Sequence, residues 1–178
     1  HQVVRRQRQM CIRDSQNIRL RSSAAEKFHA MADAAWSVNI ELVPLSGFRT
    51  VEDQQYLFFE VKAERGQEAS KRAEVSAPPG YSEHHTGYAI DIGDARMPET
   101  HFEVSFEKTI AFQWLQENAS NYGFELSFPQ DNPQGISYEP WHWRFIGDSY
   151  SLKTFEEARS LKKKEQQTEN QELTTVED

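Results

Sequence analysis

Two short clusters of metal-ligating side chains, far apart in the sequence, constrain what this chain can fold into. The first is Ser82-Glu83-His84-His85-Thr86-Gly87-Tyr88-Ala89-Ile90-Asp91 and the second is Glu139-Pro140-Trp141-His142. A metal-dependent hydrolytic site requires three protein ligands, an open coordination position and a base nearby. The clusters together supply imidazoles, a ligand carboxylate and a second carboxylate just before a histidine. If they form one site, the fold must bring two distant segments together.

The spacing within the first cluster predicts a turn. His84 and Asp91 are separated by an odd number of positions, which would place them on opposite faces of an uninterrupted strand. A turn at Thr86-Gly87 removes this difficulty, because His84 can then lie on a loop while Asp91 points inward from a strand. His142 would join them from a distant strand. His85 competes with His84 for the ligand role, and spacing alone leaves both open.

The second cluster places a candidate base beside a candidate ligand. Glu139 precedes His142, and Pro140 between them restricts the backbone of both itself and Glu139. A carboxylate in this position can accept a proton from water and deliver it to a leaving amine. Taken singly, such residues are more often solvated acids or structural histidines. Their joint occurrence in two compact clusters favours a functional site.

A third segment, Ser46-Gly47-Phe48-Arg49-Thr50, falls where a predicted strand meets a predicted helix. Arg49 in this position can project into a cleft and hold a carboxylate through two hydrogen bonds. Gln54, one turn into the helix, can add an amide donor on the same side. Trp141 is interpreted as part of the core and cleft wall, and Arg144 as a brace for the site.

Composition excludes several other classes of protein. A net charge of −8 argues against binding to nucleic acids or anionic membranes, which favour a basic surface. The sequence contains no apolar run near the roughly 20 residues that span a bilayer. Its single cysteine, Cys11, excludes an internal disulfide and a multi-thiolate metal site. Histidine and carboxylate ligands would therefore have to hold any metal.

The chain of 178 residues is long enough for one domain. We interpret residues 1–17 as a non-native or disordered segment, because its start is rich in arginine and lacks an initial Met. Residues 18–150 are expected to form the domain. Residues 151–178 are expected to be a helix that frays into a charged, disordered tail, because from Lys162 onward too few apolar side chains remain to offset the entropy of ordering.

The patterning predicts an α+β fold, with a small antiparallel sheet flanked by helices. Strands are expected at 40–45, 88–92, 124–128 and 141–146. Helices are expected after a capping box at Ser23-Ala24-Ala25-Glu26, from Thr50 to Arg65 with a stop at Gly66, and around 106–115 with a stop at Gly123. Two apolar stripes support helices: Ala24, Phe28, Met31 and Ala35, and later Leu152, Phe155, Ala158 and Leu161.

The three segments, in this order, resemble the motif series of the VanY-type D-alanyl-D-alanine carboxypeptidases, a family that includes related L,D-carboxypeptidases of peptidoglycan. The matching pattern is Ser46-Gly47-Phe48-Arg49-Thr50, Ser82-x-His84-x-x-Gly87-x-Ala89-x-Asp91 and Glu139-x-Trp141-His142. It covers roughly residues 20–148. Thr50 stands where the family often has Ser. The resemblance implies the fold shared by hedgehog domains and D-Ala-D-Ala peptidases.

The resemblance also implies roles for individual residues. One zinc ion would be bound by His84, Asp91 and His142, with Glu139 as the general base. His84 is favoured over His85 as the ligand. Contacts to the substrate's terminal carboxylate, its scissile carbonyl or its cleft are implied for Arg49, Gln54, Ser82 and Trp141.

The reaction expected from the resemblance is removal of the C-terminal D-alanine from a peptidoglycan stem peptide. Arg49 would be a catalytic residue that selects a free carboxylate end, which distinguishes an exopeptidase from an endopeptidase. An L,D-carboxypeptidase, an endopeptidase acting on crosslinks, a zinc-containing binding module without catalysis and a domain without metal remain alternatives. We expect a monomer that is exported to the periplasm or cell wall, because peptidoglycan lies outside the cytoplasmic membrane.

Overall fold

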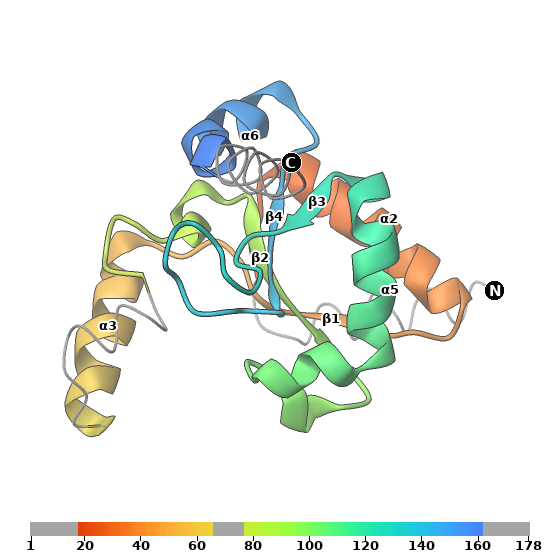
Figure 1. Ribbon diagram of the computed structural model, residues 1–178, viewed down its shortest axis with the longest axis horizontal. Helices are drawn as coiled ribbons and strands as arrows, with labels where there is room; N and C mark the ends of the chain where they lie inside the picture. The colour runs from red at the N-terminus through yellow and green to blue at the C-terminus, as the bar shows by residue number, and fades with distance from the viewer. Residues whose placement is uncertain (1–17, 66–76, 162–178) are drawn as a thin grey trace, which may run out of the picture.

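The computed structural model describes residues 18–65 and 77–161, and Figure 1 shows their arrangement. One antiparallel sheet has the strand order β1-β2-β4-β3 and consists of β1 (Leu42–Ser46), β2 (Ala89–Asp94), β3 (Phe124–Leu126) and β4 (His142–Phe145). The α-helices are α2 (Ser22–Ser37), α3 (Val51–Arg65), α5 (Ile110–Asn118) and α6 (Ser149–Thr154). Short 3-10 turns are η1 (Glu83–Thr86), η2 (Pro98–Thr100), η3 (Val104–Lys108) and η4 (Ala119–Tyr122). The predicted α+β class is confirmed.

The two central strands separate apolar from polar side chains. In β2, Ile90 and Ile92 belong to the hydrophobic core, and Asp91 between them therefore lies on the opposite face. In β4, Trp143 belongs to the core and is paired with Ile90, while Asp91 is paired with His142. The two-residue period of paired strands thus forms a core on one face and places an acid beside a histidine on the other.

Helices α2 and α5 cover the core face of the sheet and lie on the same side of it in Figure 1. The predicted apolar stripe of α2 is confirmed, because its four members are buried: Ala24, Phe28, Met31 and Ala35. Helix α5 contributes Ala111, Phe112 and Leu115 to the hydrophobic core, and strands β3 and β4 contribute Phe124 and Phe145.

The capping box predicted at Ser23 is wrong. Helix α2 begins at Ser22, and its N-cap residue, Arg21, makes no capping side-chain hydrogen bond. The Ser23 hydroxyl instead donates to Asp148 Oδ2 at 2.7 Å, a residue 125 positions later. A tertiary partner has therefore replaced the local bond that the sequence pattern suggested.

The other helix starts follow their capping residues. Thr50 caps α3, because its Oγ1 accepts from the Asp53 backbone amide at 3.1 Å while the Asp53 carboxylate accepts from the Thr50 amide. Helix α5 starts later than predicted: Phe106 lies in η3, and Thr109 caps the helix by accepting from the Phe112 amide. Gly123 ends this region in the left-handed conformation, at φ 78°, as predicted.

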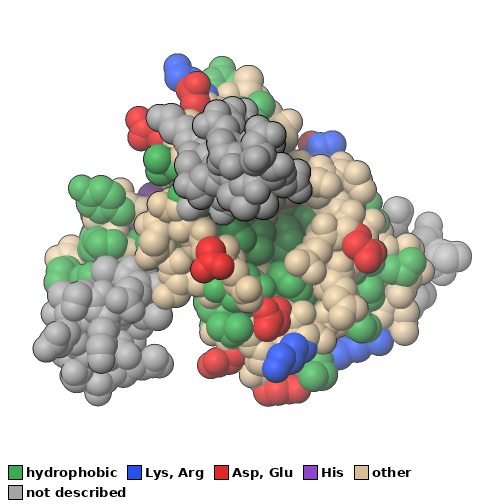
Figure 2. All heavy atoms as spheres, viewed as in Figure 1, with side chains coloured by type: hydrophobic (Ala, Val, Ile, Leu, Met, Phe, Trp, Pro, Cys, Tyr) green, Lys and Arg blue, Asp and Glu red, His purple; other side chains and the backbone are tan. Residues whose placement is uncertain are grey.

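Helix α3 projects away from the sheet in Figure 1. Its side chains Tyr56 and Phe59 are exposed, and Figure 2 shows hydrophobic side chains at the surface of this part of the molecule. At the end of α6, Phe155 is buried, but Leu152 within the helix and Leu161 beyond it are exposed. The predicted single packed stripe in this region is therefore wrong, because a turn at Phe155 interrupts the helix.

Several predictions concern residues outside the described ranges: the segment 1–17 with Cys11, the stop at Gly66 and the tail from Lys162. Within 18–65 and 77–161, no helix is long and apolar enough to cross a membrane.

Candidate metal centre

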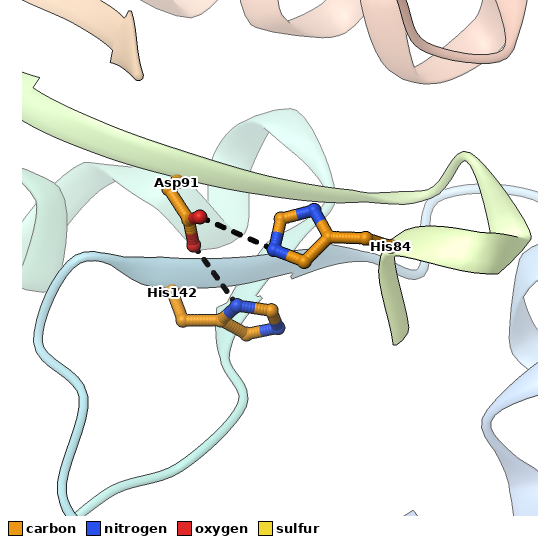
Figure 3. Close-up of side chains that lie close together, drawn as sticks. All are labelled: His84, Asp91 and His142. Carbon is orange, nitrogen blue, oxygen red and sulfur yellow. Dashed lines mark hydrogen bonds and ion pairs between the residues drawn. The ribbon is translucent and has the colours of Figure 1, made fainter. Parts of the chain in front are cut away.

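Three side chains from separate elements converge on the polar face of the sheet. His84 comes from η1, Asp91 from β2 and His142 from β4, and Figure 3 shows them pointing toward one another. Each contributes one candidate ligand atom, and these atoms all lie within 4.8 Å of one another. Asp91 lies between the histidines: its Oδ2 is 3.2 Å from His84 Nε2, and its Oδ1 is 3.0 Å from His142 Nδ1. All three residues are buried.

The turn predicted between His84 and Asp91 is present. Ser82 caps η1 by accepting from the His84 amide, and Gly87 ends it at φ 72°, where a residue with a side chain would be strained. His84 Nδ1 lies 2.8 Å from the Gly47 carbonyl oxygen. A carbonyl can only accept, so Nδ1 carries the hydrogen and Nε2 presents its lone pair toward Asp91.

His85 faces away from this cluster. Its Nε2 accepts from the Gly80 amide at 3.1 Å, so its Nδ1 carries the hydrogen and donates to the Arg49 carbonyl at 2.8 Å. His85 thus links the Gly80 turn to the segment that carries Arg49. The structure brings His84, and not His85, to Asp91 and His142.

His142 is hydrogen-bonded through both ring nitrogens. Nδ1 lies 3.0 Å from Asp91, and Nε2 lies 3.0 Å from Glu83 Oε2. Burial alone would lower the pKa of His142, but the hydrogen bonds and charges of Asp91 and Glu83 raise it to about 10. A metal ion bound at Nδ1 would have to displace the proton held there.

The other two members of the cluster keep the forms that bind metals. Burial lowers the pKa of His84, and the attraction of Asp91 opposes this shift only in part. Burial alone would raise the pKa of Asp91, but the charge and hydrogen bond of His84 and those of His142 hold it well below its usual range. His84 is therefore neutral and Asp91 ionised at neutral pH. Two imidazoles with one carboxylate are a ligand set suited to zinc, so these residues fit such an ion.

Glu139 lies at the edge of the cluster. Its Oε2 is 3.9 Å from His142 Nδ1, and its side chain is only 13% exposed. Backbone bonds hold the bend, with the Glu139 amide donating to Phe128 and its carbonyl accepting from His142. Burial raises the pKa of Glu139 to about 7, and the negative charges of Asp91 and Glu83 add to this effect. A bound cation would lower this pKa again.

Arg49 is held in place at the end of the segment that follows β1. Its Nη1 donates to Gln54 Oε1 at 2.6 Å, and its Nη2 donates to Ser46 Oγ at 2.9 Å. Gln54 is buried and donates its own Nε2 to the Ala77 carbonyl at 2.6 Å. Gln54 therefore orients Arg49 through its oxygen, while a main-chain group receives its amide hydrogen. The positive charge of Arg49 acts on Glu139, where it opposes the rise in pKa that burial causes.

Trp141 precedes His142, is partly buried and packs against the hydrophobic core. Its ring makes an edge-on contact with Phe102, with the centroids 6.4 Å apart, and Phe102 is about half exposed. Its carbonyl accepts from the Ile92 amide at 2.8 Å. This packing agrees with the core part of the interpretation, and the contact of Trp141 with a substrate stays a prediction.

Sequence reasoning missed the acid next to His84. Glu83 Oε2 accepts from Ser127 Oγ at 2.7 Å as well as from His142, and Glu83 Oε1 accepts from Arg144 Nη1 at 2.9 Å. Burial alone would raise the pKa of Glu83, but the His142 hydrogen bond and the nearby positive charges lower it to about 2. Its partners lie 44 to 61 positions away, so no local spacing pattern reveals them.

Comparison with known proteins identifies the family that this chain resembles. Residues 17–148 match the family model "VanY: D-alanyl-D-alanine carboxypeptidase". A D-alanyl-D-alanine carboxypeptidase of Enterococcus faecium is 33% identical over 138 residues, which is 76% of this chain and 40% of the relative. One from Enterococcus faecalis is 34% identical, over 72% of this chain and 49% of the relative. The chain spans less than half the length of these two curated relatives.

Solved structures give the same result. The LdcB LD-carboxypeptidase superposes with a TM-score of 0.65 at 34% identity, covering 78% of this chain and 64% of that one. VanYB in complex with D-alanine-D-alanine has a TM-score of 0.63 at 29% identity, covering 80% of each chain. A mutant of the vancomycin resistance D,D-pentapeptidase VanY in complex with Zn(II) also matches, with a TM-score of 0.63, 29% identity and coverage of 80% and 81%. The chain therefore belongs to the VanY D-alanyl-D-alanine carboxypeptidase family.

Proposed function

We propose that this chain is a zinc-dependent carboxypeptidase that removes the C-terminal D-alanine from peptidoglycan stem peptides. One observation carries the proposal: the ligand atoms of His84, Asp91 and His142 converge within 4.8 Å beside the mostly buried carboxylate of Glu139. Membership of the VanY family and the likeness to a relative in complex with Zn(II) support it.

In this proposal, zinc is held by His84 Nε2, by the Asp91 carboxylate and by His142 Nδ1. Three protein ligands leave one position for water or substrate, as in catalytic rather than structural zinc sites. When bound, zinc polarises a carbonyl and makes water a stronger nucleophile. The cysteine-free ligand set of the described site agrees with this assignment.

Glu139 is proposed as the general base and acid. Its carboxylate lies on the same side of His142 as Asp91, so it can take a proton from water that enters the open position. The same carboxyl group can then protonate the leaving amine. The bend at Pro140, which is fully buried, keeps this carboxylate beside the ligands rather than in solvent.

Arg49 is proposed to bind the free carboxylate at the end of the substrate. A guanidinium group can grip a carboxylate with two parallel hydrogen bonds, and Gln54 with Ser46 keeps that group oriented before binding. Ser82 and Trp141 are proposed as further contacts with the substrate. A substrate without a free terminal carboxylate would lose the charge-assisted contact, which favours an exopeptidase.

The bond that is cleaved has a second candidate. The LdcB LD-carboxypeptidase is 34% identical to this chain, which favours an L,D-carboxypeptidase acting on tetrapeptide stems with the same machinery. In both cases the substrate lies outside the cytoplasmic membrane. We therefore propose that the protein acts there, as an exported protein of the periplasm or cell wall.

The deciding experiment combines metal analysis with defined substrates. The purified chain is measured for zinc and then incubated with pentapeptide, tetrapeptide and crosslinked stems, and the products are identified by mass spectrometry. Loss of one D-alanine from the pentapeptide supports the D,D assignment, and loss from the tetrapeptide supports the L,D assignment. Stoichiometric zinc without cleavage of any stem would overturn the enzymatic proposal and indicate a binding module instead.

A further inference from the structure

A buried ion-pair network lies behind the candidate metal centre. Arg144, two positions after His142 on β4, shares its face of the strand and is the largest side chain among the fully buried residues of the described chain. Its Nη1 donates to Glu83 Oε1 at 2.9 Å, and its Nε donates to Glu125 Oε1 at 2.7 Å. Arg159 reaches the same oxygen of Glu125 at 3.4 Å. A buried guanidinium requires such partners, because an unpaired charge would be costly.

Glu83 connects this network to the candidate metal centre. One carboxylate oxygen is used by Arg144, and the other accepts from Ser127 Oγ at 2.7 Å and from His142 Nε2 at 3.0 Å. The carboxylate is therefore held by donors on both oxygens and cannot rotate freely. Its side chain is 12% exposed, so water competes little for these bonds.

The bond to His142 has a specific consequence for the ring. A carboxylate can only accept, so Nε2 of His142 must carry a hydrogen. The nitrogen that faces Asp91 is then Nδ1, which alone remains available as a ligand. His84 is arranged in the reverse sense, with Nδ1 tied to the Gly47 carbonyl and Nε2 facing the cluster.

We propose that Glu83 is a positioning residue that fixes the tautomer and orientation of His142, with Ser127 and Arg144 holding Glu83 in place. This inference rests on the proposed metal-dependent function and adds a residue to it. Acceptors behind ligating histidines typically matter to metal affinity by about 10- to 100-fold. The alternative is that Glu83 only neutralises Arg144, and the network offers a matched control for that alternative.

The control is Glu125. It is a carboxylate partner of Arg144 like Glu83, but its carboxylate pairs with Arg144 and Arg159 rather than with His142. Glu125→Gln should therefore weaken the network without changing the metal site. Glu83→Ala removes the acceptor from His142, whereas Glu83→Gln keeps an oxygen that can accept from Nε2 while losing the charge.

The test measures zinc affinity rather than turnover. Each full-length variant is freed of metal, checked for folding by circular dichroism and thermal unfolding, and titrated with zinc against a chromophoric chelator. Absorption spectra of the cobalt(II)-loaded proteins report the geometry of the ligands. We expect Glu83→Ala to weaken zinc binding by about 10- to 100-fold and to alter the cobalt spectrum. Glu83→Gln should remain within a few-fold of wild type, and Glu125→Gln should bind zinc as wild type does.

Ser127→Ala provides a milder variant in case Glu83→Ala does not fold. It removes one donor to Glu83, and we expect a loss of zinc affinity of a few-fold. Wild-type affinity and an unchanged cobalt spectrum in Glu83→Ala, or in Ser127→Ala if Glu83→Ala does not fold, would overturn the proposal. Equal losses in Glu83→Ala and Glu83→Gln would also overturn it, because they would trace the effect to the charge on Arg144. Failure of the wild-type chain to bind zinc would instead overturn the proposed function.

Discussion

Gly47 orients His84 toward the candidate metal centre, because its carbonyl oxygen lies 2.8 Å from the Nδ1 atom of His84. The contact joins residues 37 positions apart and leaves Nε2 facing Asp91. Gly47 is buried against the chain that precedes α2, since a Cβ atom built on it would lie 2.5 Å from the Arg19 carbonyl oxygen. The absence of a side chain at this position therefore allows the close packing that places the carbonyl oxygen beside the imidazole.

A side chain at Gly47 should disturb the site. In Gly47→Ala, the new methyl group would meet the Arg19 carbonyl and Ile18 Cγ2, at 2.5 and 2.8 Å, so the backbone has to move. We expect unfolding free energy to fall by about 1 to 3 kcal/mol and zinc affinity to fall with it. Gly135→Ala is the control, because its φ of 66° strains the backbone in open space. Equal zinc affinity in the two variants would contradict the role given to Gly47.

Removal of the proposed base should separate metal binding from catalysis. Glu139→Ala removes the carboxylate but none of the ligand atoms of His84, Asp91 and His142. We expect retained zinc and a kcat lower by about 10²- to 10⁴-fold, measured by D-alanine release and metal analysis. Glu156→Gln, at an exposed position, should have wild-type turnover. Substantial turnover in Glu139→Ala would remove Glu139 from the mechanism.

The role of Arg49 can be tested with two substrates that differ in one group. Wild type should prefer a stem peptide with a free C-terminal carboxylate over the same peptide ending in an amide. Arg49→Met should lose most of this preference, because no cation remains to pair with the carboxylate. The exposed Arg96, which bonds Asn39, provides Arg96→Met as the control. The preference is measured as the ratio of the kcat/KM values for the two substrates. If this ratio is unchanged in Arg49→Met, another group binds the terminal carboxylate.

Asp148 should stabilise the fold in a pH-dependent way. Its carboxylate accepts from the Ser151 amide at the start of α6 and from the Ser23 hydroxyl, and these bonds hold its pKa below the usual range. A lowered pKa contributes stability above the unfolded-state value of about 3.9, and this contribution is lost as the pH falls through the folded-state value. Asp148→Ala should cost about 1 kcal/mol at neutral pH.

The measurement for Asp148 is thermal unfolding as a function of pH. The difference in Tm between wild type and Asp148→Ala should narrow below about pH 4. Asp148→Asn keeps a capping oxygen without the charge, so it should lie between the two at neutral pH. A difference in Tm that stays constant from pH 7 to pH 3 would contradict the electrostatic part of the explanation.

Local patterns in the sequence were sufficient where a residue's partner lies nearby. The turn at Gly87, the cap at Thr50 and the stop at Gly123 all depend on backbone geometry within a few positions, and each was predicted. Thr109 carried an equally local signal for the start of α5, but the apolar Phe106 suggested an earlier start. Competing local signals thus shifted the boundary of an element without changing its type.

Partners distant in the sequence account for the larger errors. Ser23 forms a hydrogen bond with Asp148 instead of capping its helix, and Glu83 forms hydrogen bonds with His142 and Arg144. Neither change follows from spacing, because each depends on how strands and helices pack. The convergence of the first cluster with His142 was predicted from the ligand chemistry of the side chains, but only the known motif order favoured His84 over His85.

The strand order β1-β2-β4-β3 also affects how this protein can mature. β4 is the last strand in the described part of the chain, yet it lies between β2 and β3 and carries His142. Before β4 is inserted, the sheet lacks one of its central strands, and the site has only His84 and Asp91 as candidate ligands. Tight metal binding would therefore require that β4 has been inserted. A bound ion would stabilise the completed fold rather than direct the early steps of folding.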